Sequence, residues 1–396
     1  MLSRLAASLL PRFSCVSKRL NPTNRVSSLS VVGHPHPDHR EKRVAANSLR
    51  RFRCVSKRCL SAVSHPDHRE ELPQESQPLA GFFYNSTSEN RFPESALHFV
   101  NASGEGRPLI HPSFAFLPSR RRLRLWDCRN GLLLCRLYDA STRGGRYVVC
   151  NPATEQWVVL PEHGQAGKVG TARLGFDPAV SSHFHVFVLL VDAKGRHITG
   201  VDVYSSETGR WIHREKGWDN KVSLADPRSA TVFLNGYLYF RTVCDQWRFY
   251  IAVVDTKGES WSSFDAPCGL FSGYSNLGLI QQSQGRLHYV SLNNECDDDG
   301  WIQLEVYALK DYTNKDWILK HRGEEEEFGG VTQSYFEWTA IDPECNSIFF
   351  IDGSDKTLKR YDMDCQQITE LITLGEAETP YLPYVPLYSE LESLRK

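Results

Sequence analysis

A chain of 396 residues with 41% hydrophobic and 23% charged residues can bury a core, either as one large domain with an extension or as two domains, which excludes disorder throughout. The formal net charge of -1 gives no whole-chain argument for nucleic-acid binding. The 11 cysteines are scattered without a regular framework, which predicts reduced thiols, and no run approaches the ~18 apolar residues of a membrane span.

The start of the chain is basic and repeats itself. Residues 1–72 hold 14 Lys and Arg against 5 Asp and Glu, a net charge of +9, so the remaining residues sum to -10. The stretch "RFSCVSKRL" from Arg12 returns as "RFRCVSKRC" from Arg51, and "HPDHRE" from His36 returns from His65. Basic extensions of this kind often act as targeting signals or as docking segments for a partner. The composition predicts helical or irregular structure up to residue 78.

From residue 79 onward the pattern is typical of an all-β domain, because short apolar runs alternate with Gly, Asn, Asp and Ser turns. We therefore divide the chain into a basic segment, 1–78, and a β domain, 79–396. A predicted hairpin recurs about every 50 residues in the β domain. Each copy has a turn-forming residue six positions before an apolar one: Asn151 and Trp157, Ser205 and Trp211, Asp255 and Trp261, Asp311 and Trp317, Asp362 and Ile368.

A second hairpin precedes most of these copies. Its turns are predicted at Asn130-Gly131, Asn235-Gly236 and Gln284-Gly285, and around 343–346. Each unit therefore has four antiparallel strands, and such units in series predict a β-propeller rather than a meandering β-sandwich. Each recurring Trp is expected to fill the space between two blades. Five blades are recognisable, and the leftover stretches 79–103 and 381–388 predict a sixth that joins both ends of the chain.

The same stretches resemble a known plant family. "RFRCVSK", "HPDHRE" and "LAGFFY" resemble the second half of an F-box and its lead into the next domain. "NGLLLC" and "YVVCNPATEQWVVLP", between Asn130 and Pro161, resemble the opening of the F-box-associated, kelch-like propeller, and "YVPLYSELESL" resembles its end. The resemblance implies a non-catalytic, substrate-recognition subunit of an SCF-type (Skp–cullin–F-box) E3 ubiquitin ligase. In such a subunit the F-box binds the Skp adaptor and the propeller binds the target.

The F-box part departs from the family pattern. The opening helix of the form L-P-x-D is absent before Leu2, Ala6 replaces the usual Pro, and Leu20 and Cys59 replace the usual Trp in the two copies. A degenerate, truncated and partly duplicated F-box explains these features. The residues that match the pattern are the adaptor-binding candidates: Leu5, Leu10, Phe13, Val16, Leu49, Phe52 and Val55. Because buried aromatic anchors often carry interface energy, adaptor docking can be lost, which leaves a stand-alone protein-binding propeller as the alternative.

Target-binding residues are expected in loops between strands, since propellers commonly bind there. The candidates are Trp218, Trp247, Tyr274 and Trp301. No nucleophile elbow, P-loop, dinucleotide fingerprint or zinc-protease motif is present, so we expect no enzyme activity and no cofactor. An enzyme that uses the central mouth of the propeller is the remaining alternative, because the fold alone does not decide catalysis.

Other chemical sites are disfavoured. The set Cys54, Cys59, His65 and His68 is spaced too tightly for a zinc finger, and the acidic stretch 293–301 lacks the EF-hand pattern. No metal is therefore expected. The basic run "RRRLRL", 120–125, lacks interleaved aromatic residues, which favours a linker along the propeller over a nucleic-acid site.

The expected location is the cytoplasm or the nucleus. The alternative is import into an organelle, because Asp38 is the first acidic residue after five Lys and Arg among many serines. A fluorescent reporter fused to residues 1–40 tests this point in plant cells. We expect a diffuse signal, and a signal confined to one organelle would contradict the prediction.

Overall fold

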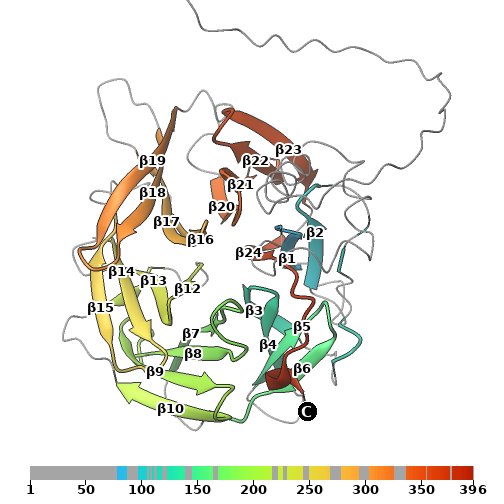
Figure 1. The fold of residues 1–396 in the computed structure, drawn as a ribbon, viewed down its shortest axis with the longest axis vertical. Helices are drawn as coiled ribbons and strands as arrows, with labels where there is room; N and C mark the ends of the chain where they lie inside the picture. Colours follow the sequence, from blue (N-terminus) through green and yellow to red (C-terminus); the bar gives the residue numbers. More distant parts are fainter. Residues whose placement is uncertain are drawn as a thin grey trace, which may run out of the picture. The chain divides into compact units, whose positions relative to one another are not determined.

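The computed structural model describes residues 78–86, 97–104, 107, 109–110, 114–117, 123–138, 145–163, 168–215, 222–225, 230–243, 249–267, 278–293, 303–324, 336–353, 355–374 and 377–395 (Figure 1). The chain divides into two units, Met1–Glu70 and Glu71–Lys396, and the described residues all belong to the second. The extension predicted to be helical or irregular therefore lies outside the described residues, except for Pro78. None of the described helices is long and apolar enough to cross a membrane.

The described strands form six sheets, which are the blades of a propeller. Blade I has β3 (Leu123–Arg129), β4 (Leu132–Tyr138), β5 (Gly145–Asn151) and β6 (Gln156–Val159). Blade II has β7 (Lys168–Gly175), β8 (His185–Val191), β9 (Ile198–Ser205) and β10 (Arg210–Glu215). Blade III has β11 (Ser223–Leu224), β12 (Val232–Leu234), β13 (Tyr237–Val243), β14 (Phe249–Asp255) and β15 (Trp261–Asp265). Blade IV has β16 (Leu279–Ser283), β17 (Arg286–Asn293), β18 (Gln303–Asp311) and β19 (Asp316–Glu324). Blade V has β20 (Phe336–Ile341), β21 (Ser347–Asp352), β22 (Thr357–Asp362) and β23 (Gln367–Thr373). Blade VI has β24 (Ala377–Tyr384), β1 (Gly81–Ser86) and β2 (Leu97–Asn101).

The six blades close into a ring. Their innermost strands, β3, β7, β12, β16, β20 and β24, contact one another in that order, and β24 contacts β3 again (Figure 1). Each blade buries its two faces against its neighbours, and a separate apolar cluster fills each of the six seams between blades. The predicted six-bladed, all-β propeller is therefore confirmed.

The inner hairpins form at the predicted turns. Asn130 and Gly131 have φ values of 45° and 88°, and both Asn235-Gly236 and Gln284-Gly285 also have two positive φ values. Two positive φ values in a two-residue loop define a type I′ turn, whose twist matches that of the flanking strands. Asn and Gly favour this backbone conformation, so the local sequence sets the register of these hairpins.

The outer hairpins explain the six-residue spacing. Asp311 Oδ1 accepts hydrogen bonds from the backbone N–H groups of Thr313 at 2.7 Å and Asn314 at 3.1 Å. Lys315 then takes a positive φ of 62°, and Trp317 follows in β19. Asn151 and Asp362 cap their turns in the same way. A side-chain acceptor at the start and a left-handed residue near the end produce a turn of fixed length.

The recurring Trp side chains pack in the seams, as predicted. Trp157, Trp211, Trp261 and Trp317, and Ile368 in the fifth copy, each contact the cluster shared with the preceding blade. Trp211 Nε1 donates to the carbonyl of Pro161 at 2.8 Å, and Trp317 Nε1 donates to that of Asp265 at 3.3 Å. Pro161 follows the outer strand β6 of blade I, and Asp265 ends the outer strand β15 of blade III. The Trp residues therefore join neighbouring blades through apolar packing and through hydrogen bonds.

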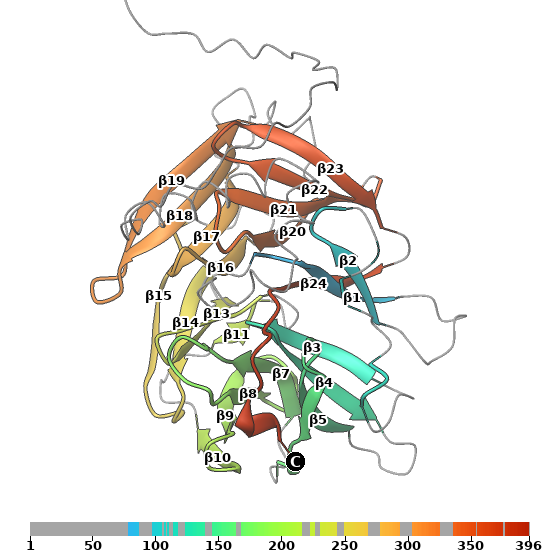
Figure 2. The ribbon, with the colours of Figure 1, turned by 45° about the vertical axis from the view of Figure 1, so that its right-hand side comes forward.

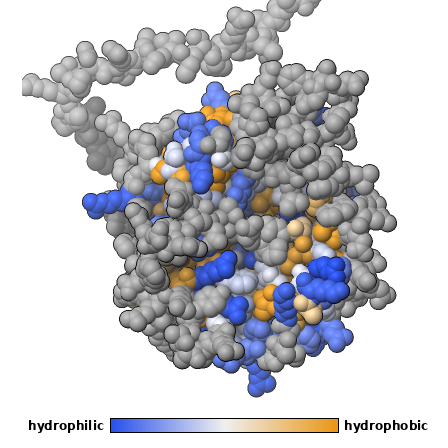
Figure 3. All heavy atoms as spheres, turned by 180° about the vertical axis from the view of Figure 1, so that it is seen from behind, coloured by the Kyte–Doolittle hydropathy of each residue, from blue (hydrophilic) through white to orange (hydrophobic). Residues whose placement is uncertain are grey.

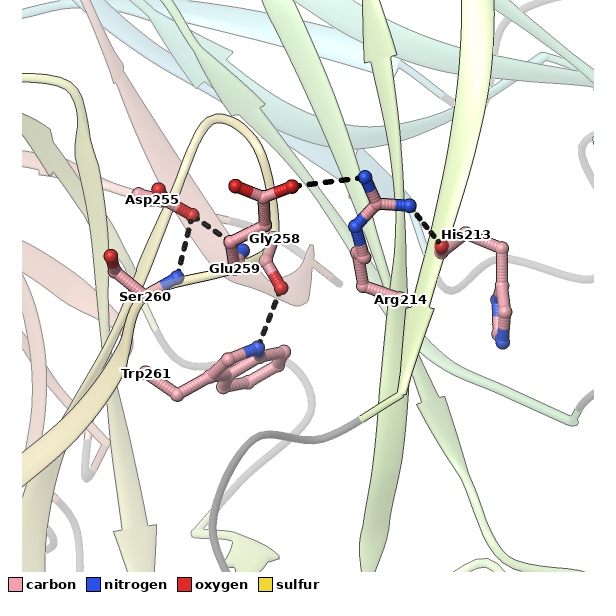
Figure 4. Close-up of polar contacts among 7 residues, drawn as sticks. All are labelled: His213, Arg214, Asp255, Gly258, Glu259, Ser260 and Trp261. Carbon is pink, nitrogen blue, oxygen red and sulfur yellow. Dashed lines mark hydrogen bonds and ion pairs between the residues drawn. The ribbon is translucent and has the colours of Figure 1, made fainter.

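Trp261 uses a different acceptor (Figure 4). Its Nε1 donates to Gly258 in its own turn at 2.8 Å, and Asp255 Oδ1 accepts from the backbone of Glu259. The neighbouring blade is reached instead through an ion pair of 3.0 Å between Glu259 and Arg214 of β10. This pair is exposed, so its contribution to stability is small.

One blade departs from the predicted four strands. The inner strand of blade III is divided, because β11 and β12 both pair with β13. In blade VI the described residues form three strands, and β1 pairs with β2 on one side and with β24 on the other. Phe114 and Leu117, which follow β2 in the chain, lie in the seam with blade I.

After β24 the chain continues along blades I and II and ends in a 3₁₀ helix, η5 (Glu392–Leu394) (Figure 2). Leu387, Leu391 and Leu394 are buried in the seam between these blades. Asn151 Nδ2 donates to the Leu387 carbonyl at 2.8 Å, and the Leu391 N–H donates to Gln156 Oε1 at 2.9 Å. The C-terminal segment is therefore part of the propeller core.

Gly131→Ala tests this docking. A Cβ at Gly131 would lie 2.3 Å from the Cβ of Leu387, whereas a Cβ at Gly236 meets nothing within 4 Å. Both glycines have similar positive φ values, so both Ala variants bear the backbone strain of about 1–2 kcal/mol. We expect Gly131→Ala to lower the free energy of unfolding by about 1–3 kcal/mol more than Gly236→Ala does, because the added methyl group overpacks the contact with Leu387. Urea denaturation measures both losses, and equal losses would contradict the docking of the C-terminal segment.

Candidate partner-binding face

The propeller has two different faces. The turns inside the inner and outer hairpins leave from one face, which we call the turn face, and all of them belong to the described residues. The other connections leave from the opposite face, which we call the loop face; they include the long segments 266–278, 294–302 and 325–335. Seen from behind (Figure 3), hydrophilic side chains in blue lie among smaller orange areas, and no wide apolar patch is visible among the coloured atoms.

The four target-binding candidates lie outside the described residues. Trp218 falls between β10 and β11, Trp247 between β13 and β14, Tyr274 between β15 and β16, and Trp301 between β17 and β18. All eight flanking strand ends lie on the loop face, in the consecutive blades II, III and IV. The candidates therefore stay predictions, and the topology assigns their connections to one face.

The adaptor-binding candidates also lie outside the described residues, since all seven fall within 1–77. These are Leu5, Leu10, Phe13, Val16, Leu49, Phe52 and Val55. The same holds for Cys54, Cys59, His65 and His68. Only the sequence supports these predictions.

Two arginines lie where the seam between blades I and II reaches the loop face. Arg124 of β3 is paired directly opposite Arg136 of β4, and Arg136 is paired with Tyr147 of β5. The guanidinium carbon of Arg136 lies 5.4 Å from the ring centre of Tyr147 and 5.9 Å from that of Trp126. Arg124 was expected in a linker, and this expectation is wrong, because it lies inside the innermost strand of blade I.

Blade II carries three exposed cations on its side toward blade III. Its first strand, β7, begins with the exposed Lys168, which is paired with Val191. The next residue, Val169, packs in the seam with blade I, so Lys168 lies on the opposite face of the sheet. The Lys168 ammonium lies 2.6 Å from the position of a Cβ at Gly195, in the turn between β8 and β9, where Lys194 and Arg196 are also exposed. His197, near the end of that turn, pairs with Ser223 of blade III.

A buried carboxylate lies in the seam between blades I and II. Asp202 of β9 is 2% exposed, and its two oxygens lie 2.7 Å from Nδ1 of His213 and 3.3 Å from Nδ1 of His163. Burial raises the pKa of Asp202, but the hydrogen bonds and charges of the two imidazoles outweigh burial and hold that pKa below its usual value. Asp202 therefore stays ionised and joins the residues after β6 to blade II.

Cations on the opposite side of the ring are paired with acidic groups. Lys359 of blade V lies 2.9 Å from Asp352 and 3.4 Å from Glu370. Although burial lowers the pKa of Lys359, these carboxylates outweigh it and raise that pKa. In blade IV, Arg322 lies 2.7 Å from the buried Glu305. Each of these two cations therefore has a carboxylate partner within its own blade.

The cysteines of blade I are structural. Cys128, Cys135 and Cys150 are buried free thiols in the seam with blade VI. Burial raises the pKa of Cys128, and the hydrogen bond with Cys135 together with burial raises the pKa of Cys150. Protonated, buried thiols are poor nucleophiles and poor metal ligands. Among the described residues, no group of three His, Cys, Asp or Glu side chains is arranged to hold a metal ion.

Comparison with known proteins identifies the family. Residues 102–362 match the F-box associated beta propeller domain. The chain belongs to this family. F-box protein At5g07610 of Arabidopsis thaliana is 28% identical over 277 residues, which cover 67% of this chain and 63% of that protein. The predicted resemblance to plant F-box proteins with this propeller is therefore confirmed.

Other matches are more distant. F-box protein At2g16450 of Arabidopsis thaliana is 23% identical over 341 residues, covering 80% of this chain and 72% of that protein. The match covers 63% of the length of At5g07610 and 46% of the length of F-box protein At1g30790 of Arabidopsis thaliana. The solved structure of TolB from Acinetobacter baumannii aligns with a TM-score of 0.41 and 11% identity, over 80% of this chain and 68% of that one. A likeness of that degree supports no argument about function.

Sequence reasoning missed the pair formed by Arg124 and Arg136. A register counted from the Asn130-Gly131 turn alone would place Arg124 opposite Leu137. The irregularity in β3 between Leu125 and Asp127 shifts the pairing by one residue and brings Arg124 opposite Arg136. Because the sequence gives no signal for this irregularity, the pair could not be derived from the hairpin.

Asp202→Asn tests the buried carboxylate. The pKa of Asp202 is lower in the folded state than its ordinary value of 3.8. The ionised carboxylate therefore stabilises the folded state above pH 3.8, and this stabilisation is lost as pH falls through the folded pKa. At neutral pH we expect the free energy of unfolding of the variant to be about 1.5–3 kcal/mol lower than that of wild type, which is the usual contribution of hydrogen bonds to a charged group. Urea denaturation at several pH values measures the difference from wild type.

That difference should shrink below pH 3.8 as Asp202 takes up a proton in the wild type. Glu259→Gln is the control, because it removes an exposed carboxylate and should change stability by at most about 1 kcal/mol. A difference that stays constant down to strongly acidic pH would show that Asp202 does not act through its charge.

Proposed function

We propose that this chain is a non-catalytic substrate-recognition subunit of an SCF-type E3 ubiquitin ligase. Residues 1–78 bind a Skp-type adaptor, and through it a cullin-RING ligase, while the propeller binds the protein to be ubiquitinated. The observation that carries this proposal is the propeller family match over residues 102–362, together with relatives that are named F-box proteins. Ubiquitin transfer itself belongs to other subunits, so no catalytic residue is required of this chain.

The geometry agrees with a binding role. A closed ring is a rigid scaffold, and its connections can vary without disturbing the seams. The turn face carries short hairpins and the C-terminal segment, whereas the loop face carries the long connections. We place target recognition on the loop face for this reason. We also propose a cytoplasmic or nuclear location, where such ligases act.

The second candidate is a stand-alone binding propeller. Its support is the departure of the F-box-like segment from the family pattern, where Leu20 and Cys59 stand at the usual Trp position. The loss of an aromatic anchor can weaken a complex strongly, since every 1.4 kcal/mol is about a tenfold change in affinity.

Calorimetric titration of the full chain with a Skp-type adaptor separates the two candidates. We expect binding at micromolar affinity or better, roughly -8 kcal/mol or stronger. Phe13→Glu combined with Phe52→Glu should abolish it, because both copies then place a charge where the adaptor buries an apolar ring. Leu319→Glu is the control, since Leu319 is 44% exposed on β19 of the propeller.

The absence of binding by a folded full-length chain would sink the ligase proposal and favour the stand-alone propeller. Equal binding by the Phe13 and Phe52 double variant would show that the duplicated segment is not the docking site. Folding of each variant is checked by its urea midpoint.

A further inference from the structure

We propose that a small oxyanion, carrying a carboxylate or a phosphate group, binds at the centre of the ring between blades I, II and III. The site consists of Arg129 of β3, Arg173 of β7 and Thr231, which directly precedes β12. These three strands are the innermost ones of their blades, and β7 contacts both β3 and β12 (Figure 1). This inference goes beyond the proposed function, because it concerns a small ligand and not a protein partner.

Arg173 and Thr231 face each other across the seam between blades II and III. Arg173 is paired with Phe187, which packs in that seam together with Phe233. Since side chains two residues apart on a strand share a face, Thr231 lies on the same side as Phe233. A Cβ at Gly175 would lie 2.8 Å from the Phe233 ring, so these two residues are at the same depth. Both strands run from the loop face to the turn face, so counting back two residues on each brings Arg173 beside Thr231.

Arg129 reaches the same place from blade I. Its Nη2 donates to the carbonyl of Thr231, past β7, which lies between β3 and β12. Arg173 Nη1 donates in the opposite direction, to the carbonyl of Trp126 in β3 at 3.4 Å, and also to that of Ala172 at 2.9 Å. Strand β8 pairs with the outer edge of β7, so both side chains pass its inner edge. Two guanidinium groups are therefore held on the axial side of one strand.

Two hydrogen-bond donors at this place have no acceptor. Thr231 is 4% exposed, and its Oγ1 has no hydrogen-bond partner among the described residues. The same holds for Arg129 Nε, which is also a buried atom. Leaving buried donors unbonded is costly, and native folds rarely do so. An oxyanion that accepts from both donors removes this cost.

Within the described part of the chain, Arg129 forms no ion pair, in contrast to Arg322 of blade IV. Asp127 lies two positions earlier on β3, but its two oxygens accept the backbone N–H groups of Cys128 at 2.9 Å and Leu174 at 2.8 Å. Asp127 is thus engaged with the backbone. The planar fork of a guanidinium group matches the oxygens of carboxylate and phosphate groups, so the Arg129 side chain favours such an anion.

The burial of the donors favours a small ligand. Thr231 is buried, whereas Arg129 is half-buried and remains in contact with solvent. An ion of a few atoms can meet both side chains, whereas a folded protein surface touches only exposed residues. The bound ion contacts three consecutive blades, so it should stabilise the folded ring by mass action.

Calorimetric titration of the full-length chain with sodium phosphate and with sodium succinate tests this proposal, with sodium chloride at equal ionic strength as the reference. We expect saturable binding of at least one of the two oxyanions and none of chloride. The oxyanion that binds more tightly assigns the site to phosphate or to carboxylate chemistry. Binding of neither would overturn the proposal.

Thr231→Val is the decisive variant, because it removes the hydroxyl and keeps a side chain of similar shape. The hydroxyl has no partner in the fold, so the unliganded variant should have a urea midpoint at least as high as that of wild type. Its affinity for the oxyanion should fall at least about tenfold, the effect of losing a hydrogen bond to a charged group. Unchanged affinity would overturn the proposal, since a buried water would then be the partner of the hydroxyl.

Arg129→Gln should weaken binding at least as much, because it removes a positive charge and the Nε donor. The matched control is Arg210→Gln, since Arg210 is exposed at the start of β10 and its replacement changes the net charge by the same amount. This control should bind the oxyanion like wild type. Equal weakening by the two arginine variants would contradict a specific site. The adaptor titration does not involve these residues, so a chain that binds the adaptor but no oxyanion retains the proposed function and loses only this inference.

Discussion

The pairing of β24 with β1 is the constraint on which the rest of the structure depends. It joins the two ends of the propeller, with Gly81 opposite Tyr384 and Phe83 opposite Leu382. Because successive side chains of a strand point to opposite faces, Phe82 enters the seam with blade V and Phe83 enters the seam with blade I. Both rings are fully buried. One short strand thus supplies a buried ring to each of two seams. The contacts involved are far apart in sequence, which makes this closure entropically costly and slow to form during folding.

The C-terminal segment extends this closure by one more seam. Leu387 and Leu391 fill the seam between blades I and II after β24 has completed blade VI. Asn151 and Gln156, which hold the segment, belong to the outer hairpin of blade I. The same hairpin that generates the repeated sequence pattern therefore also receives the end of the chain. Asn151 and Gln156 therefore have tertiary contacts in addition to their place in the outer hairpin.

Most of the fold could be predicted from the sequence because it repeats a local code. Positive φ values at Asn130-Gly131 and at Lys315 are favoured by the residues themselves and by short-range side-chain caps, so the turns and the Trp positions are visible without any tertiary contact. The divided inner strand of blade III has no such signal, because it depends on β11 and β12 both pairing with β13. The pairing of Arg124 with Arg136 has none either, because it depends on the irregularity between Leu125 and Asp127 in β3. The aromatic candidates of blades II to IV lie outside the described residues, so the structure places only the strand ends beside them.

The distribution of charge follows from burial, since burial of an unpaired charge is costly. In blade V the largely buried cation Lys359 lies 2.9 Å from Asp352. In blade IV the buried group is the carboxylate of Glu305, and the exposed Arg322 pairs with it at 2.7 Å. Arg136 of blade I has its guanidinium over the rings of Trp126 and Tyr147. Lys168, Lys194 and Arg196 of blade II are exposed. Water solvates their charges, so the fold does not have to supply a buried carboxylate for them.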